Sequence, residues 1–162
     1  MPKFRHIRRV LDEALRLWPT APAFTRSPNA DTVIGDRYRM RPQDWATILI
    51  PLIHRDPSVW GKDAEEFRPD RFLPKSSRGR PPHSYKPFGT GERACIGRQF
   101  ALHEAVLVLA RLLHRYDITG DPGYELAISE RLTLMPKDFQ IMLARRTPPA
   151  SDAGDRCSGV FP

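Results

Sequence analysis

A glycine-punctuated loop, FGTGERACIG at residues 88–97, leads directly into a long stretch of periodic apolar residues. Residues 98–116 carry apolar side chains at three- and four-residue spacing, which predicts one long helix in the core. The apolar positions are Ala101, Leu102, Ala105, Val106, Leu109, Leu112 and Leu113. Cys95 would lie among free backbone N–H groups at the positive end of this helix. The free N–H groups and the helix dipole both favour a thiolate at this position.

The neighbours of Cys95 add chemical functions to the loop. Glycines at 89, 91 and 97 permit positive φ and let the backbone pass close to a flat partner. Arg93 offers a rigid fork for a carboxylate, and Phe88 can shield the sulfur from water. A lone cysteine in a glycine-rich loop is more often inert than a ligand, so only the full pattern indicates a function.

The chain begins with a predicted helix over residues 3–18, which Pro19 ends. The apolar stripe of this helix is Ile7, Val10, Leu11, Ala14 and Trp18. A loop is expected at 20–24. Two short strands are then predicted on either side of a hairpin turn at Gly35 and Asp36.

A third strand is predicted over 45–50 and ends at Pro51. Its apolar run is continuous, as in a strand buried on both faces. Asp56 before Pro57 signals a short helix, and Asp63 indicates another helical turn.

The remaining segments are shorter or irregular. Residues 74–87 are rich in Pro, Ser and basic side chains, which is typical of a surface loop. After a turn at 121–123, strands are predicted around 125–128, 132–135 and 139–144. Repeated βαβ units are absent from the pattern, so the fold class is α+β.

Composition limits the function only broadly. The 162 residues make one domain or a piece of one, without an apolar run of the ~20 residues that a membrane span needs. The basic N-terminus lacks a signal-peptide pattern, so we expect a cytoplasmic protein. A net charge of +7 permits an acidic protein, a membrane surface or nucleic acid as partner. Nucleic acid is disfavoured because the aromatic residues do not alternate with a basic stripe.

The histidines and the second cysteine show no ligand pattern. His54, His83, His103 and His114 have no carboxylate or thiol at metal-ligand spacing, and we assign them to the surface or to packing. Cys157 lies in a tail without apolar periodicity and is expected to be an exposed free thiol.

FGTGERACIG resembles the haem-binding signature of the cytochrome P450 monooxygenases. The resemblance implies haem b (iron protoporphyrin IX) as cofactor, with Cys95 as the axial iron ligand and catalytic residue. It also implies that Arg93 pairs with a haem propionate, that Phe88 tunes the thiolate, and that Ala101 lets the helix pack on the porphyrin. The implied cofactor-binding set is Phe88, Gly89, Gly91, Arg93, Cys95, Ile96, Gly97 and Ala101.

Two further segments match the same family in the family's order. Glu13 and Arg16 in DEALRLWP resemble its Glu-x-x-Arg helix, although such a pair is more often a solvated surface pair. It falls on the side opposite the apolar stripe. FRPDRF, residues 67–72, resembles the FxPxRF segment, with Asp70 in place of the commoner Glu, and supplies Arg71. The resemblance implies that Glu13, Arg16 and Arg71 form a buried structural charge network.

Longer matches are similar to the bacterial fatty-acid hydroxylases whose haem domain is fused to a diflavin reductase. This similarity implies a small hydrophobic, fatty-acid-like substrate, O2, and electrons from NADPH through FAD and FMN of a flavoprotein reductase, fused or separate. It places Ala21, Pro22, Phe24 and Leu132 in the substrate channel, with ordinary loop packing as the alternative for each. Lys86, Arg93, Arg98, Arg111 and Arg115 offer a face on which an acidic reductase could dock, although such a basic face is more often merely solvated.

The family's oxygen-activating helix precedes its Glu-x-x-Arg helix, so this chain is expected to start too late to contain it. We therefore predict a mainly helical P450 fold of which only the C-terminal part is present. This part has the Glu-x-x-Arg helix, a small β-sheet, the meander, the cysteine loop, the long haem-packing helix and a terminal β-hairpin. It spans residues 1–145, and 146–162 form a disordered tail or the start of a linker. The alternative is a truncated, non-catalytic haem-binding fragment or a chain that does not fold.

Overall fold

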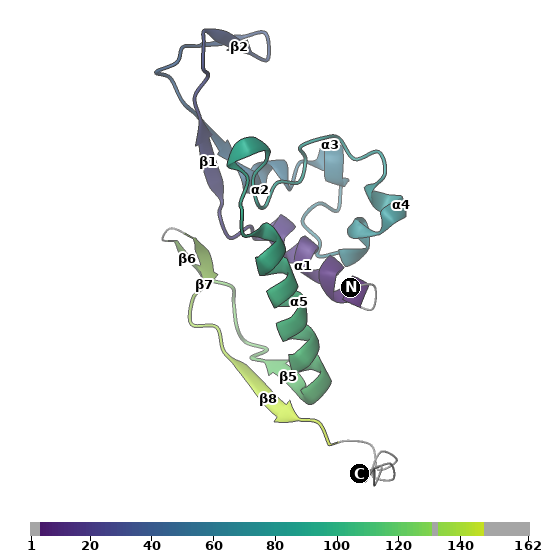
Figure 1. Cartoon of the computed structure of the whole chain (residues 1–162). Helices are drawn as coiled ribbons and strands as arrows, with labels where there is room; N and C mark the ends of the chain where they lie inside the picture. The colour runs from purple at the N-terminus through teal and green to yellow at the C-terminus, as the bar shows by residue number, and fades with distance from the viewer. Residues whose placement is uncertain (1–3, 131–132, 148–162) are drawn as a thin grey trace, which may run out of the picture.

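Two helices packed against each other form the centre of the molecule (Figure 1). They are α1 (Arg5–Leu17) and α5 (Arg98–Arg115), both within two residues of their predicted bounds. The computed structural model describes residues 4–130 and 133–147. A β-hairpin projects at one end of the molecule, and a two-stranded ribbon follows the far end of α5. The short helices lie beside α1.

Helix α1 buries the opposite face from the one that its apolar stripe predicts. Glu13, Arg16 and Leu17 are buried, whereas Trp18 is 43% exposed. The stripe residues Ile7, Val10, Leu11 and Ala14 are only half-buried. The solvated-pair interpretation of Glu13 and Arg16 is therefore wrong, because the segment after β4 covers the charged side of α1.

The strands form separate antiparallel pairs instead of the one small sheet that was predicted. β1 (Ala23–Arg26) pairs with β4 (Ala46–Leu49), so the expected loop at 20–24 already contains the start of a strand. β2 (Thr32–Ile34) and β3 (Tyr38–Met40) form the projecting hairpin.

The hairpin turn is confirmed, with positive φ at both Gly35 and Asp36. The expectation that β4 is buried on both faces is wrong. Its residues alternate between half-buried and exposed, because its one partner strand, β1, leaves much of its surface uncovered.

Short helical segments lie between β4 and α5. They are α2 (Ile50–Ile53), α3 (Pro57–Trp60), η2 (Pro69–Phe72), α4 (Pro74–Ser77) and η3 (Gly91–Arg93). The predicted cap of α3 is confirmed: Asp56 Oδ1 accepts hydrogen bonds from Ser58 N at 2.9 Å and Ser58 Oγ at 2.7 Å. These bonds lower the pKa of Asp56. Three details differ from prediction. Pro51 lies in the first turn of α2, the segment at Asp63 is a turn without a helix, and the loop at 74–87 begins with α4.

After α5 the chain forms two more strand pairs. β5 (Tyr116–Gly120), which was not predicted, pairs with β8 (Ile141–Arg145). β6 (Ile128–Glu130) and β7 (Leu134–Pro136) form the terminal hairpin. Only Leu102 and Val106 of α5 are buried, so the expectation that its whole apolar set is core is wrong for the described part of the chain. Leu113 is 42% exposed.

The buried centre between α1 and the following segments is an ionic network. Arg16 donates to both Glu13 carboxylate oxygens at 2.7 and 2.9 Å. It also donates to the carbonyl oxygens of His54, Ala64 and Glu66. Glu13 Oε1 accepts a further bond from the Arg68 N–H at 2.7 Å.

Arg71 completes this network from the η2 segment. Its Nε lies 3.5 Å from Glu13 Oε1, and its other end binds the Asp63 carboxylate and the Trp60 carbonyl. The Arg71 hydrogen bond lowers the pKa of Asp63. Glu13, Arg16 and Arg71 therefore join α1 to the chain after β4.

His54 is fully buried beside this network. Its ring lies 5.1 Å from the Tyr85 ring and 6.5 Å from the Trp60 ring, measured between centroids. Nδ1 pairs with the Arg16 carbonyl at 3.1 Å, and Nε2 accepts the Lys86 N–H at 2.8 Å. An acceptor at Nε2 requires the neutral ring. Burial lowers the pKa of His54 to about 4.

Among the residues that the structure describes, no helix combines the length and the apolar character needed to cross a bilayer.

Removing the buried carboxylate should be far more damaging than removing an exposed one. We expect Glu13→Gln to lower the free energy of unfolding by about 3–5 kcal/mol, because Arg16 and Arg71 then lose their shared anion. The exposed pair Arg55–Glu65 provides the control, since Glu65→Gln makes the same chemical change at a side chain that is 75% exposed. Its expected cost is about 0–1 kcal/mol. Equal costs in urea denaturation would contradict a buried network.

Acid should destabilise the fold through His54. An unfolded histidine has its ordinary pKa of 6.5, whereas the folded His54 has a pKa of about 4. Between these pH values the unfolded chain binds a proton that the folded chain does not. The contribution of His54 to the free energy of unfolding is therefore fully present above pH 6.5, and it is lost as the pH falls toward 4. The loss approaches about 3 kcal/mol.

Denaturation at a series of pH values checks this expectation, with His54→Gln as the control. The other four histidines, His6, His83, His103 and His114, are exposed and remain in the variant. A loss of stability of the same size in the variant over this pH range would show that His54 is not its source.

Candidate functional site

The cysteine loop is a closed turn held by its own backbone. The Cys95 N–H donates to the Phe88 carbonyl at 2.9 Å, and the Gly89 N–H donates to the Lys86 carbonyl at 3.1 Å. Gly89 and Gly91 have φ of +68° and +74°, a conformation that side chains with a Cβ rarely adopt. The predicted need for glycine is thus confirmed at these two positions.

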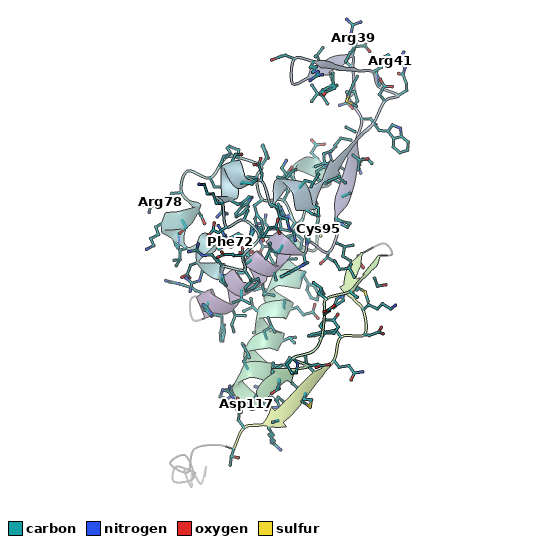
Figure 2. All side chains as sticks on the ribbon, turned by 180° about the vertical axis from the view of Figure 1, so that it is seen from behind. Arg39, Arg41, Phe72, Arg78, Cys95 and Asp117 are labelled. Atoms are coloured by element: carbon teal, nitrogen blue, oxygen red, sulfur yellow. The ribbon has the colours of Figure 1, made fainter. Side chains whose placement is uncertain are left out.

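The loop delivers Cys95 to the first turn of α5. The Arg98 N–H donates to the Cys95 carbonyl at 3.3 Å, and the Ala101 N–H donates to the Gly97 carbonyl at 2.9 Å. Cys95 is a free, exposed cysteine. Figure 2 shows it where the start of α5 approaches the base of the β1–β4 pair. Its sulfur is therefore accessible to a ligand near the positive end of an 18-residue helix.

A mainly apolar cavity of about 560 Å³ opens beside Cys95. The cysteine loop, α5, α1 and the segment around β1 contribute its walls. The lining residues are Leu11, Leu15, Thr20, Ala21, Ala23, Phe24, Arg26, Ile50, Pro87, Phe88, Gly89, Arg93, Cys95, Ala101, Leu102 and Ala105. Cys95 thus lines an open cavity between segments that are far apart in the sequence.

The cavity brings together most of the predicted cofactor-binding residues. Phe88, Gly89, Arg93, Cys95 and Ala101 all line it. Predicted substrate-channel residues share this cavity, since Ala21 and Phe24 also line it.

Other predicted site residues lie outside the cavity lining. The Ile96 side chain is fully exposed, and Gly91 lies in η3 on the loop. Gly97 lies against the cysteine, because a Cβ built there would be 3.9 Å from Cys95 Sγ. Pro22 contributes its carbonyl to the Ile50 N–H at 2.8 Å. Leu132 lies outside the described residues, as does Cys157.

Sequence reasoning missed the wall that α1 contributes. Leu11 was placed in the apolar stripe, but neither it nor Leu15 was assigned to a site. Their four-residue spacing on a predicted helix was the available signal. Ala105 was likewise assigned to the core, although its place one turn after Ala101 marks a line of small residues along α5.

The donor set of this cavity suits a haem. A thiolate-ligated haem needs one protein sulfur at the iron, apolar surface against the porphyrin and a cation for a propionate. Cys95, the aliphatic walls and Arg93 supply these three features in one cavity. Gly89, with no side chain, and Ala101, with only a methyl group, leave room for a flat group to approach the loop and α5.

The predicted basic docking residues do not form one patch. Lys86, Arg93 and Arg98 belong to the cysteine loop and the first turn of α5. Arg111 follows Arg98 by 13 residues on the same helix, which places it about 20 Å farther along the axis. Arg111 and Arg115, one turn apart, therefore form a separate basic pair at the far end.

Comparison with known proteins places this geometry in a family. The family model described as cytochrome P450 matches residues 2–143. The bifunctional cytochrome P450/NADPH–P450 reductase 1 of Bacillus subtilis (strain 168) is 53% identical over 141 residues, which is 87% of this chain and 13% of that protein. The self-sufficient cytochrome P450 monooxygenase CYP505E5 of Aspergillus kawachii is 46% identical over 142 residues, 87% of this chain and 14% of that protein.

A solved structure agrees with these matches. The crystal structure of a cytochrome P450 (CYP102L1) superimposes with a TM-score of 0.85 at 50% identity, over 90% of this chain and 33% of that one. The chain thus spans a small part of its curated relatives and a third of this solved chain. The predicted resemblance and the partial P450 fold are confirmed, and the chain belongs to the cytochrome P450 family.

Proposed function

We propose that residues 1–145 are the C-terminal part of a haem-thiolate monooxygenase domain, in which Cys95 is the axial ligand of the haem iron. The observation that carries this proposal is the position of the Cys95 sulfur, beside an apolar cavity and near the positive end of α5. Residues 146–162 are proposed to be a tail or the start of a linker, and the whole protein to act in the cytoplasm.

The complete enzyme would insert one oxygen atom from O2 into an organic substrate. Bound haem supplies the oxygen chemistry, and in this family the cysteine thiolate favours O–O cleavage, a family property rather than a result of this geometry. The chain's own residues would hold the haem in place. Arg93 would neutralise a propionate, Phe88 would limit water at the sulfur, and Ala101 would allow close packing of α5.

A fatty-acid-like substrate fits the mainly apolar character of this cavity. Ala21 and Phe24 contribute apolar surface to it, and Arg26, whose guanidinium lies 4.8 Å from the Phe24 ring centroid, also lines it. We propose that these two residues, with Pro22 between them in the sequence and Leu132, which lies outside the described residues, border the substrate channel.

A flavoprotein reductase is the proposed electron donor. It would carry FAD and FMN, take electrons from NADPH, and be fused to this domain or separate from it. Two Bacillus subtilis relatives are bifunctional cytochrome P450/NADPH–P450 reductases, which supports the fused arrangement. Lys86 and Arg98, close to Cys95 in the sequence, are the basic residues proposed to face an acidic reductase surface.

The alternative is a non-catalytic haem-binding fragment or a chain that does not fold alone. The exposed apolar side chains on α5 favour this alternative for the isolated chain. Leu107 is 48% and Val108 50% exposed in the described part of the molecule. An apolar helix face of this kind promotes association unless another segment covers it.

Haem titration separates these possibilities. We expect the full chain to give a Soret band typical of thiolate ligation, and Cys95→Ser to lose that band because an alcohol does not replace the thiolate. Cys157→Ser, at the other cysteine in the sequence, is the matched control and should keep it. A thiolate band that survives in Cys95→Ser contradicts the proposal. The lack of a band in every protein supports the non-folding alternative.

Phe24 tests the proposed substrate channel. In the haem-loaded protein, Phe24→Ala should weaken binding of a long-chain fatty acid about tenfold, because the ring's apolar contact is lost. Phe24→Leu keeps most of the apolar volume and should bind within about threefold of the original protein. Binding is measured by the spectral change on fatty-acid titration. Equal affinities in all three proteins would remove Phe24 from the channel.

A further inference from the structure

His54 connects the ionic network to the cysteine loop through its two ring nitrogens. Nδ1 pairs with the Arg16 carbonyl at 3.1 Å, at the last turn of α1. Nε2 accepts the Lys86 N–H at 2.8 Å, two residues before Phe88. The His54 carbonyl also accepts a bond from Arg16 Nη1 at 2.8 Å. The side chain and the backbone of one residue thus both contact Arg16.

The contact at Lys86 continues into the backbone of the loop. The Lys86 carbonyl accepts the Gly89 N–H at 3.1 Å, and the Phe88 carbonyl accepts the Cys95 N–H at 2.9 Å. Both bonds depend on where residues 86–89 lie. Fixing the Lys86 amide therefore fixes the start of the turn that closes on Cys95.

The surroundings of the His54 ring restrict its orientation. Its packing against Tyr85 and Trp60 restricts rotation, and the Tyr85 hydroxyl is itself held by the Asp12 carbonyl at 2.9 Å. Arg16 lies 5.0 Å from the Trp60 ring centroid on the network side. An imidazole that is fully buried and paired at both nitrogens is rigid enough to position a backbone amide.

We propose that His54 is a positioning residue for the axial cysteine, acting through the Lys86 amide to hold the cysteine loop on the end of α1. This inference rests on the proposed function only for the role of Cys95. His54 does not contact the cofactor cavity, and its effect on the sulfur passes entirely through the backbone of residues 86–95.

Two amide variants separate this role from simple packing. The Gln side-chain amide reaches the position of Nε2 and can offer its oxygen to the Lys86 N–H. The shorter Asn amide reaches only the position of Nδ1 and can serve the Arg16 carbonyl but not Lys86. His54→Gln should therefore preserve the hydrogen bond to the Lys86 N–H. His54→Asn should lose that bond and keep the one to the Arg16 carbonyl.

The first readout is hydrogen exchange of the Lys86 amide in the full chain, which requires no haem. We expect His54→Asn to accelerate exchange at Lys86 about tenfold, because a buried hydrogen bond is lost. In His54→Gln the exchange rate should stay within about threefold of the original. The second readout is the fraction of bound haem that gives a thiolate-type Soret band. This fraction should fall in the His54→Asn variant and stay unchanged in the His54→Gln variant.

The outcomes decide the inference independently of the proposed function. The positioning role is supported if only the His54→Asn variant shows faster exchange at Lys86 and a smaller fraction of thiolate-ligated haem. Equal behaviour of Gln and Asn overturns it, whether both match the original protein or both lose the contact. If the original protein gives no thiolate band but its Lys86 amide is protected from exchange, the proposed function fails while the exchange rates of the variants still decide whether His54 holds the loop. A Lys86 amide without protection in the original protein overturns the inference.

Discussion

The guanidinium of Arg16 is the interaction on which the rest of the structure depends. Its five N–H donors all have partners: two bonds go to Glu13, and one each to the carbonyls of His54, Ala64 and Glu66. A buried charge is tolerated only when it is paired and fully hydrogen-bonded, and this one is. The three carbonyl partners belong to segments with little regular structure. The hydrogen bonds from Arg16 therefore order these segments, as backbone hydrogen bonds do in a sheet or a helix.

The hydrogen bonds of Arg16 also affect the position of the Cys95 sulfur. The segment after β4 has little regular structure, and short helices of four residues contribute little stability of their own. Attachment to Arg16 gives this segment a fixed position on α1. His54 lies in the same segment and contacts the Lys86 amide, so the position of the cysteine loop depends on the same α1 helix. A charge pair on the first helix thereby influences a residue some eighty positions later in the chain.

Features that depend only on residues close together in the chain were predictable from the sequence. The Asp56 cap, the Gly35–Asp36 turn and the bounds of both long helices depend on neighbouring residues, and all were predictable. The buried face of α1 was not, because an amphipathic pattern assumes an apolar core, and here the covering segment supplies carbonyls. Spacing alone could not show that Glu13 and Arg16 are buried; the family resemblance could. β5 was missed because its partner β8 lies more than twenty residues later.

The inverted burial of α1 also explains where the cavity lies. With its charged side committed to the network, the helix turns its apolar side away from the segment after β4. Leu11 and Leu15 on that side become walls of the cavity beside Cys95, instead of core. An apolar helix face is costly in water but favourable against a flat apolar cofactor. The ionic network thus lies against one side of α1, and the apolar cavity lies against the other. Because the charged side is buried in the network, the apolar side is free to line the cavity.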